Sequence, residues 1–312
     1  MNSLVTVILP AGRAAIELSL FVLLPIMVVM LSIMRLLEAR GVMDWLVARL
    51  APLLRPFGLT GLGVFAALQV NFVSFAAPLA TLSMMESRGA SDRHLAAAFA
   101  MVLAMAQANA TFPMAALGLN IGPVLLWSLV GGLVAAAATT YGFGRSLSDA
   151  DHVMDETLRH PVAETTKGVL DVINRAGGEA FKIAIGAIPM LVLALVSITA
   201  LRQMGALDML IRLLSPALLL AGIDPAVILP TLTKYLAGGT AMMGVVDEQV
   251  RQGVMPARLL NASAGFLIHP MDLPGIAILM SAGRRVAAVW RPACLGACVG
   301  IAVRTLGHVL VG

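Results

Sequence analysis

Long apolar runs separated by short charged segments form the pattern of this chain. Three runs, Ala14 to Met34, Ile183 to Leu201 and Val286 to Val311, are long enough to cross a bilayer as helices. Two other segments have apolar residues at helical spacing with charged residues off the stripe, which predicts amphipathic helices lying at the membrane surface. The first stripe consists of Met43, Leu46, Val47, Leu50, Leu53, Leu54 and Phe57, and the second of Leu207, Leu210, Ile211, Leu214 and Leu218.

The pattern of the first half recurs in the second half. At a constant offset of 164 residues, the matched pairs include Gly41 with Gly205, Asp44 with Asp208, Pro52 with Pro216, Gly58 with Gly222 and Gly89 with Gly253. Gly and Pro serve particular backbone conformations, so these matches indicate one structural unit present twice. We predict a first repeat over residues 1–143, a solvated linker over 144–181 and a second, inverted repeat over 182–312.

Four apolar stretches are interrupted by polar or helix-breaking residues at corresponding places in the two repeats. Pro removes a helical hydrogen-bond donor, so a span with an internal Pro is expected to form two half-helices. The four stretches are Thr60 to Met85, Pro225 to Val246, Leu95 to Leu119 with its break from Gln107 to Pro113, and Leu259 to Met280 with its break from His269 to Gly275.

The basic residues decide whether the first two of these stretches cross the membrane. If both cross, Lys and Arg are divided almost evenly between the two faces. If both are re-entrant hairpins, fourteen basic residues lie on one face and six on the other, with Lys234 left aside. Positively charged loops stay in the cytoplasm, so we predict hairpins, three crossings per repeat and a cytoplasmic linker. The six residues of the less basic face are Arg13, Arg202, Arg212, Arg251, Arg258 and Arg304.

Composition limits the class of protein. Hydrophobic residues make up 59% of the 312 residues and charged residues only 12%, which excludes a soluble enzyme. Aromatic content of 5% without short alternating strands disfavours an outer-membrane barrel. The net charge of +4 is explained by cytoplasmic loops, so we expect no nucleic-acid partner. The predicted fold is therefore all-α and integral to a bacterial inner (plasma) membrane, in multi-pass form.

The interruptions locate the candidate site, because irregular backbone survives at membrane depth only inside protein or beside a watery cavity. Titratable groups there are expensive to bury and are functional candidates by default. We expect a Lys234 to Asp272 pair to be mutually neutralising, and the pair or His269 to carry a coupling proton, unless Lys234 binds an anionic solute. The predicted solute-binding residues are Gln69, Asn71, Ser74, Gln107, Asn109, Thr111, Lys234, Tyr235, Thr240, His269 and Asp272.

The order of span, surface helix, hairpin, broken span and span, present twice, resembles the core of the concentrative nucleoside transporters. More broadly the chain is similar to the gate, or nucleoside-recognition, domain family, which includes spore maturation proteins and the membrane part of ferrous iron transporters. The hairpins Gln69 to Pro78 and Thr233 to Thr240 carry the resemblance, with the breaks at Asn109 to Pro113 and His269 to Gly275. The resemblance implies a solute site at the hairpin tips. A lysine, Lys234, stands in the second hairpin.

These features predict a secondary transporter of a small polar or anionic organic solute, nucleoside-like or an organic acid, working by alternating access. One alternative is a membrane component that acts with a partner protein and transports nothing. A second alternative is metal-ion transport, although we predict no bound metal and no other cofactor. No catalytic motif is present, so we expect no enzymatic activity. The sequence leaves open proton or sodium coupling and a homo-oligomeric state. The expected partners are membrane lipid and the solute.

Overall fold

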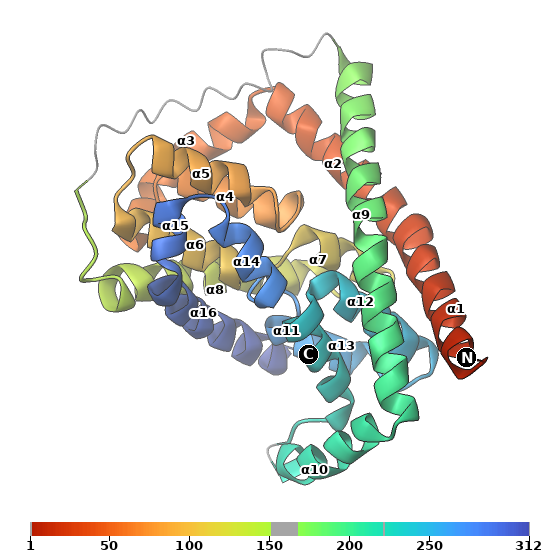
Figure 1. The fold of residues 1–312 in the computed structure, drawn as a ribbon. Coiled ribbons are helices and arrows are strands. Elements are labelled where there is room, and N and C mark those ends of the chain that lie inside the picture. The colour runs from red at the N-terminus through yellow and green to blue at the C-terminus, as the bar shows by residue number, and fades with distance from the viewer. Residues whose placement is uncertain (1, 151–167, 221, 312) are drawn as a thin grey trace.

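The computed structural model describes residues 2–150, 168–220 and 222–311. All regular structure in this part of the chain is helical, which confirms the all-α prediction (Figure 1). Five helices are long and apolar enough to cross a membrane, so the chain is a multi-pass membrane protein. They are Ile8–Ala39, Asp92–Ala115, Ile121–Phe143, Val169–Leu201 and Trp290–Val311. The remaining predicted span, Leu259 to Met280, is divided between two short helices.

The first half begins with one long helix and ends with another. Its helices are α1 (Asn2–Glu17), α2 (Leu24–Ala39), α3 (Val42–Leu54), α4 (Gly61–Phe72), α5 (Pro78–Ser87), α6 (Asp92–Ala104), α7 (Ala108–Ala115) and α8 (Ile121–Ala138). A π-helical segment, Leu18–Leu23, joins α1 to α2, and a second one, Thr139–Phe143, follows α8. The short 3-10 helix Arg55–Phe57 follows α3. The segment from Val42 to Phe57, which contains α3 and this turn, is bent by 105° from α4.

The second half has the same order of elements, except that one helix replaces α1 and α2 and a short additional helix precedes the last one. Its helices are α9 (Val169–Gln203), α10 (Ala206–Leu220), α11 (Ile228–Ala237), α12 (Gly239–Arg251), α13 (Ala257–Leu267), α14 (Leu273–Met280), α15 (Arg284–Ala288) and α16 (Trp290–Val311), with a short 3-10 helix at Pro225–Val227 before α11. The helix pairs α4–α5 and α11–α12 lie at the positions of the two predicted hairpins, and their re-entrant course in the membrane stays a prediction. The pairs α6–α7 and α13–α14 are the two predicted broken helices.

The matched glycines have matched backbone conformations. Gly41 and Gly205 have φ of 71° and 70°, Gly58 and Gly222 of 79° and 71°, and Gly89 and Gly253 of 78° and 71°. These left-handed conformations are readily accessible to glycine alone and end a helix at equivalent points of each half. The long helices α1–α2 and α9 run antiparallel (Figure 1). Arg35, near the end of α2, contacts Glu179, near the start of α9, whereas Ala14 in α1 lines a groove together with Leu195, nearer the end of α9. Inversion of the two repeats across a membrane stays a prediction.

Two predicted boundaries differ from the structure. Residues 169–181, expected in the linker, form the start of α9, because Val172, Ala176 and Ala180 pack as a buried stripe; residues 151–167 of that linker lie outside the described residues. The first broken helix is interrupted at residues 105–107, which overlaps the predicted break only at Gln107, and Pro113 lies inside α7. Here the N–H of Ala106 donates to Ser128 Oγ at 2.7 Å, which replaces its helical hydrogen bond.

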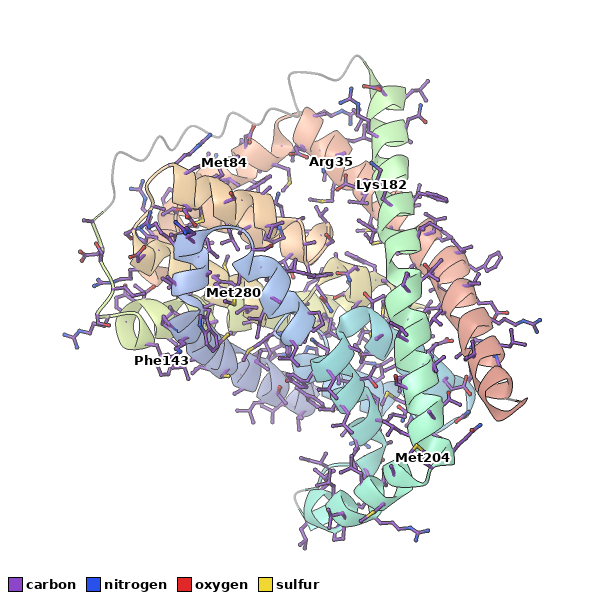
Figure 2. The ribbon with its side chains drawn as sticks, in the orientation of Figure 1. Arg35, Met84, Phe143, Lys182, Met204 and Met280 are labelled. Carbon is purple, nitrogen blue, oxygen red and sulfur yellow. The ribbon has the colours of Figure 1, made fainter. Side chains whose placement is uncertain are left out.

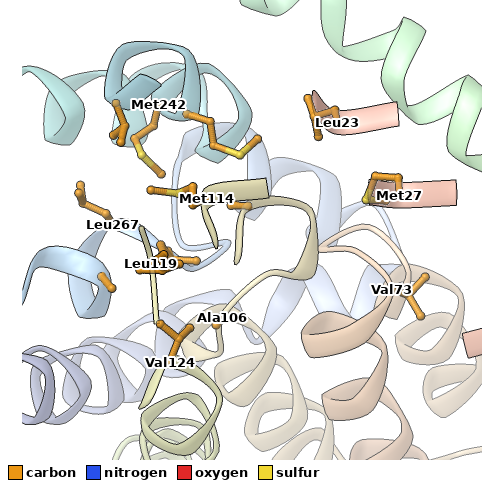
Figure 3. Packing of buried hydrophobic residues seen from close by; sticks show 14 of the residues in the cluster. Leu23, Met27, Val73, Ala106, Met114, Leu119, Val124, Met242 and Leu267 are labelled. Atoms are coloured by element: carbon orange, nitrogen blue, oxygen red, sulfur yellow. The ribbon is translucent and has the colours of Figure 1, made fainter. Parts of the chain in front are cut away.

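The interrupted helices lie within the core. Residues 95–104 of α6 are all buried, and the α7 region packs with the hairpins and the long helices around Met27, Met114, Met242 and Leu267 (Figure 3). Helices α8 and α16 approach backbone to backbone: a Cβ on Gly300 would lie 2.2 Å from the carbonyl oxygen of Gly131. Small residues allow such close helix contacts in membrane proteins. The contact places the side chains of α16 beside the break of α6.

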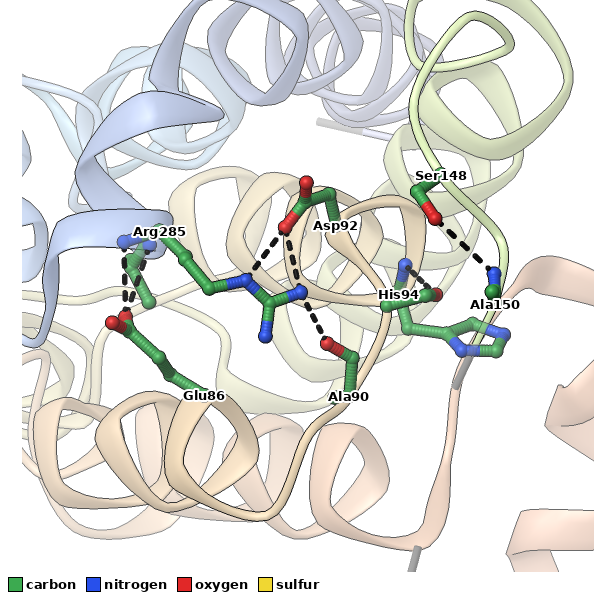
Figure 4. A network of polar contacts seen from close by, with 9 residues as sticks. Glu86, Ala90, Asp92, His94, Ser148, Ala150 and Arg285 are labelled. Atoms are coloured by element: carbon green, nitrogen blue, oxygen red, sulfur yellow. Dashed lines mark hydrogen bonds and ion pairs between the residues drawn. The ribbon is translucent and has the colours of Figure 1, made fainter. Parts of the chain in front are cut away.

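A polar network fastens the first hairpin to the second half (Figure 4). Glu86 at the end of α5 accepts hydrogen bonds from the N–H groups of Arg285 and Val286 at the start of α15, both at 3.2 Å. The Arg285 guanidinium pairs with Asp92 at 2.7 Å and donates to the carbonyl of Ala90 at 2.7 Å. The Glu86 carboxylate thus accepts hydrogen bonds from N–H groups at the start of α15 that lack helical partners, while the Arg285 side chain binds the loop between α5 and α6.

Candidate functional site

All four interruptions line one cavity. Its volume is about 460 Å³, which lies in the usual range for small-molecule sites. Its wall is completed by Leu23 between α1 and α2 and by the face of α9 that carries Glu179, Lys182 and Gly186; Lys182 is labelled in Figure 2. The interrupted segments contribute Ser74 to Ala77, Gln107, Asn109, Ala237 to Thr240, Asp272, Pro274, Gly275 and Ile278. The hairpin turns and the helix breaks therefore converge, as the sequence predicts.

The predicted ion pair is present behind this cavity. Lys234 Nζ binds Asp272 Oδ2, and the side chains of the two residues are 0% and 4% exposed. The other carboxylate oxygen of Asp272 accepts the N–H of Gly275 at 2.7 Å and thereby caps α14. An unpaired charge at this depth would be strongly destabilising, so each residue allows the other to remain ionised. Asp272 lines the cavity, whereas Lys234 does not.

His269 and Tyr235 lie beside this pair and away from the cavity lining. His269 is fully buried and its Nδ1 accepts the N–H of Met271 at 3.1 Å, inside the break of the second half. The Tyr235 hydroxyl lies 3.4 Å from His269 Nε2, and the Lys234 ammonium lies 5.6 Å from the centre of the Tyr235 ring. In this conformation both side chains support the backbone and the ion pair.

In the first half, neutral groups make the corresponding contacts. Asn109 Oδ1 accepts the N–H of Phe75 at 3.3 Å, which joins the break to the turn of the first hairpin. Ser74 Oγ accepts the N–H of Ala77 at 3.2 Å within that turn. Gln107 is 2% exposed, and its Nε2 has no hydrogen-bond partner among the described residues. This amide lies against Gly239, where an added Cβ would be 1.8 Å from Nε2.

Three other predicted site residues hold the fold together away from the cavity. Gln69 accepts a hydrogen bond from Thr81 at 2.6 Å and so ties α4 to α5. Asn71 accepts from Ser128 at 2.7 Å, and Thr111 donates to the carbonyl of Gln107 at 3.0 Å. Of the eleven predicted residues, the cavity lining includes Ser74, Gln107, Asn109, Thr240 and Asp272; it does not include Gln69, Asn71, Thr111, Lys234, Tyr235 and His269.

Arg304 is the main residue that the sequence pattern places wrongly. The pattern assigns it to the less basic face, yet it is 0% exposed in the interior of the bundle. Its guanidinium donates to the carbonyl of Ala104 at 2.5 Å and to that of Ile268 at 3.0 Å. These carbonyls end α6 and α13, so one cation satisfies the C-terminal ends of both broken helices. The signal that could have identified it is an arginine well inside the last apolar run.

Glu179 and Lys182, expected in the linker and on the basic face, instead form part of the cavity wall. Glu179 pairs with Arg35 of α2 at 2.9 Å, so the two long helices are joined near the cavity. Lys182 is exposed and has no ion-pair partner among the described residues. Within the described part of the chain, no group of three or more His, Cys, Asp or Glu side chains could hold a metal ion.

Comparison with known proteins agrees with this arrangement. Residues 20–123 match the family described as Gate, nucleoside recognition. The resemblance predicted from the sequence is confirmed. Spore maturation protein B of Bacillus subtilis (strain 168) is 40% identical over 74 residues, which is 24% of this chain and 41% of that protein. The chain thus matches less than half the length of this curated relative.

The fold is also that of the solved transporter CNTnw. The inward-facing, substrate-bound structure of CNTnw matches with a TM-score of 0.66 and 18% identity over 94% of this chain and 74% of that one. An outward-facing structure of a doubly substituted CNTnw variant gives a TM-score of 0.67 at 18% identity, over 99% and 83% of the two chains. At this level of identity the likeness concerns the fold.

Proposed function

We propose that this protein is a secondary transporter of a small polar or anionic organic solute, either nucleoside-like or an organic acid. The observation that carries the proposal is the single cavity lined by both hairpin turns and both helix breaks. Irregular backbone at membrane depth is maintained where it lines a solute path. The CNT-like fold and the nucleoside-recognition match support this reading. We place the protein in a bacterial inner membrane, with the linker between the two repeats in the cytoplasm.

Alternating access requires the hairpins to move against the long helices, and two grooves separate these parts. A groove of about 450 Å³ lies between α2 and the first hairpin and includes Phe65 and Ala80. A groove of about 280 Å³ lies between α1, α9 and the second hairpin and includes Leu229 and Gly244. These residues correspond at the offset of the internal repeat. Equivalent grooves on the two hairpins would allow the site to open alternately to either side.

Liposome uptake by the purified protein tests transport. A thermal-shift screen of nucleosides, organic acids, amino acids and divalent metals selects solutes for the uptake assay. We expect Gly239→Leu to abolish uptake, because its side chain would overlap Gln107 and fill the cavity. Gly142→Leu is the matched control, since an added Cβ there meets nothing within 4 Å. Uptake by a folded Gly239→Leu variant at the wild-type rate would contradict the proposal.

We propose further that the Lys234–Asp272 pair, or the neighbouring His269, carries the coupling proton. Asp272 contacts both the cavity and the buried lysine, so filling of the cavity could alter the balance of charge in the pair. Uptake driven by an imposed pH gradient should be lost in Lys234→Met if the pair couples, and in His269→Gln if the histidine does. Gradient-driven uptake that survives both changes would eliminate proton coupling at these groups.

A second candidate function is a structural or partner-dependent role in the membrane. The 40% identity with spore maturation protein B over 74 residues favours it. Under this alternative the cavity is vestigial, so Gly239→Leu would leave the cellular role intact while no solute from the screen shifts the melting temperature. A deletion strain complemented with wild-type, Gly239→Leu and Gly142→Leu proteins separates the two functions.

A further inference from the structure

Four helices begin at the cavity. The second helix of each interrupted pair has its N-terminal cap in the cavity lining: Ala77 for α5, Gln107 for α7, Gly238 for α12 and Asp272 for α14. A helix N-terminus carries roughly half a positive charge and several N–H groups without helical partners. The Asp272 carboxylate occupies the terminus of α14 and also interacts with the N–H of Gly239, the first of α12. The remaining N–H groups of α12 and the terminus of α7 have no resident carboxylate among the contacts of the described residues.

The negative ends of the broken helices are neutralised elsewhere. The last carbonyls of α6 and α13 accept hydrogen bonds from the buried guanidinium of Arg304. Arg304 has no carboxylate partner among the described residues, so its charge adds to the positive potential of the interior. In each broken helix, the C-terminal carbonyl end of the first half-helix is therefore bound by Arg304, whereas the N-terminal N–H groups of the second half-helix lie toward the cavity.

The charged side chains around the cavity and the helix breaks leave a positive surplus. Asp272 pairs with Lys234, and Glu179 shares the guanidinium of Arg35 with Glu38. Lys182 in the lining offsets the second of these glutamates, so the guanidinium of Arg304 remains without a carboxylate among the described residues. At membrane depth such a surplus is weakly screened, so it favours a solute of opposite charge.

The Gln107 side chain supplies the observation that points to a ligand. Its Nε2 is buried at the start of α7, against Gly239 at the start of α12, and has no acceptor within the described part of the chain. A buried donor without an acceptor has lost its hydrogen bond to water and gained none in return, which is unfavourable. An oxygen-bearing ligand between these two helix termini would satisfy it.

We propose, resting on the transport function above, that the solute is an organic anion whose carboxylate or phosphate oxygens bind between the N-termini of α7 and α12. Gln107 Nε2 and the backbone N–H groups in the first turn of α12 after Gly239 donate to those oxygens, and Lys182 attracts the anion to the cavity. This assignment selects the anionic part of the solute range and rejects neutral analogues of the same shape.

Matched neutral and anionic probes test the charge preference. The wild-type protein is assayed by thermal shift and liposome uptake with uridine against uridine 5′-monophosphate, and with succinamide against succinate. We expect the anionic member of at least one pair to raise the melting temperature and to be taken up, with at least tenfold weaker binding of its neutral analogue. The pair that responds distinguishes a phosphate from a carboxylate. Preference for the neutral member overturns the anion assignment and leaves transport standing.

Substitution of Gln107 tests the assignment without any solute. Gln107→Glu places a carboxylate among the helix termini, and we expect a melting temperature at or above that of the wild type. Gln107→Lys, of similar length and opposite charge, should lower it. A Gln107→Lys variant that is as stable as Gln107→Glu overturns the proposal. If no solute of the full screen binds or is taken up, the transport function fails, and this comparison still decides the charge preference of the cavity.

Substitution of Lys182 is a second test that should not disturb folding, because the side chain is exposed. Lys182→Gln should weaken binding of the anionic probe about two- to fivefold, the size expected for one partly screened charge, and leave the neutral probe unchanged. Equal weakening of both probes, or of neither, overturns the role given to Lys182 and to the surplus charge.

Discussion

The two halves of the molecule use the same backbone device with different chemistry. In the first half a neutral hydrogen bond, from the Phe75 N–H to Asn109, joins the hairpin turn to the broken helix. In the second half the ion pair of Lys234 with Asp272 makes the equivalent connection. A neutral bond needs no compensating charge, whereas each partner of a buried ion pair depends on the other. Both halves line the cavity, but its charged side chains, Glu179, Lys182 and Asp272, all come from the second half.

Breaking the ion pair should have the largest effect. Lys234→Met leaves the Asp272 carboxylate unpaired in the interior, and we expect a loss of about 3 to 5 kcal/mol in the free energy of unfolding. Lys234→Met combined with Asp272→Asn should recover a substantial part of it, because no unpaired charge remains. Thermal unfolding in detergent, followed by circular dichroism, measures both. Equal stability of the single and double variants would contradict the dependence of each charge on the other.

Removal of the Arg304 side chain should cause the second-largest loss of stability. Arg304→Met leaves the carbonyls of Ala104 and Ile268 without their donor, and we expect a loss of about 2 to 3 kcal/mol for two unsatisfied acceptors. Arg291→Met, on the same helix but at an exposed position, is the control and should change stability by less than about 0.5 kcal/mol. The same unfolding assay applies. Similar losses for the two variants would argue against a role of Arg304 at the helix breaks.

The hairpin turns should differ in their tolerance of a side chain. Gly238 has φ of 91°, and a Cβ there is strained, so Gly238→Ala should cost about 1 to 2 kcal/mol. Its counterpart Ser74 already carries a side chain, and Ser74→Ala should cost less than about 1 kcal/mol, the value of one hydrogen bond to the N–H of Ala77. Unfolding midpoints of the pair measured side by side would show the difference. The reverse order would contradict the comparison.

Loss of the neutral connection between Phe75 and Asn109 should have a much smaller effect than loss of the ion pair. Asn109→Ala removes one acceptor from the Phe75 N–H, and we expect a cost of about 1 kcal/mol in stability. Uptake should fall more than stability, because Asn109 also lines the cavity. Thermal unfolding and liposome uptake of the same variant compare the loss of stability with the loss of transport. An Asn109→Ala variant as destabilised as Lys234→Met would show that charge is not what distinguishes the halves.

Much of the fold is accessible from the sequence because each element depends on local chemistry. Gly41, Gly58 and their counterparts end helices through left-handed backbone, and the hairpin turns follow from clustered polar and glycine residues. The first break lies nearer the N-terminus than predicted, since Ser128, distant in the sequence, accepts the N–H of Ala106. The helical part of the predicted linker depends on packing of Ala176 and Ala180 against the first half, which no local pattern reveals.

The sequence by itself determined that the chain crosses a membrane, the order of its elements and which of its helices are broken. Hydropathy, glycine and proline act over a few residues, and lipid leaves few ways to satisfy an exposed backbone. Tertiary structure decided which polar groups face the cavity. Asn109 and Asp272 do, while Gln69 and Lys234 turn to partners contributed by other helices, and Arg304 reaches two helix ends far apart in the chain. Those outcomes depend on which side chains meet after the helices pack.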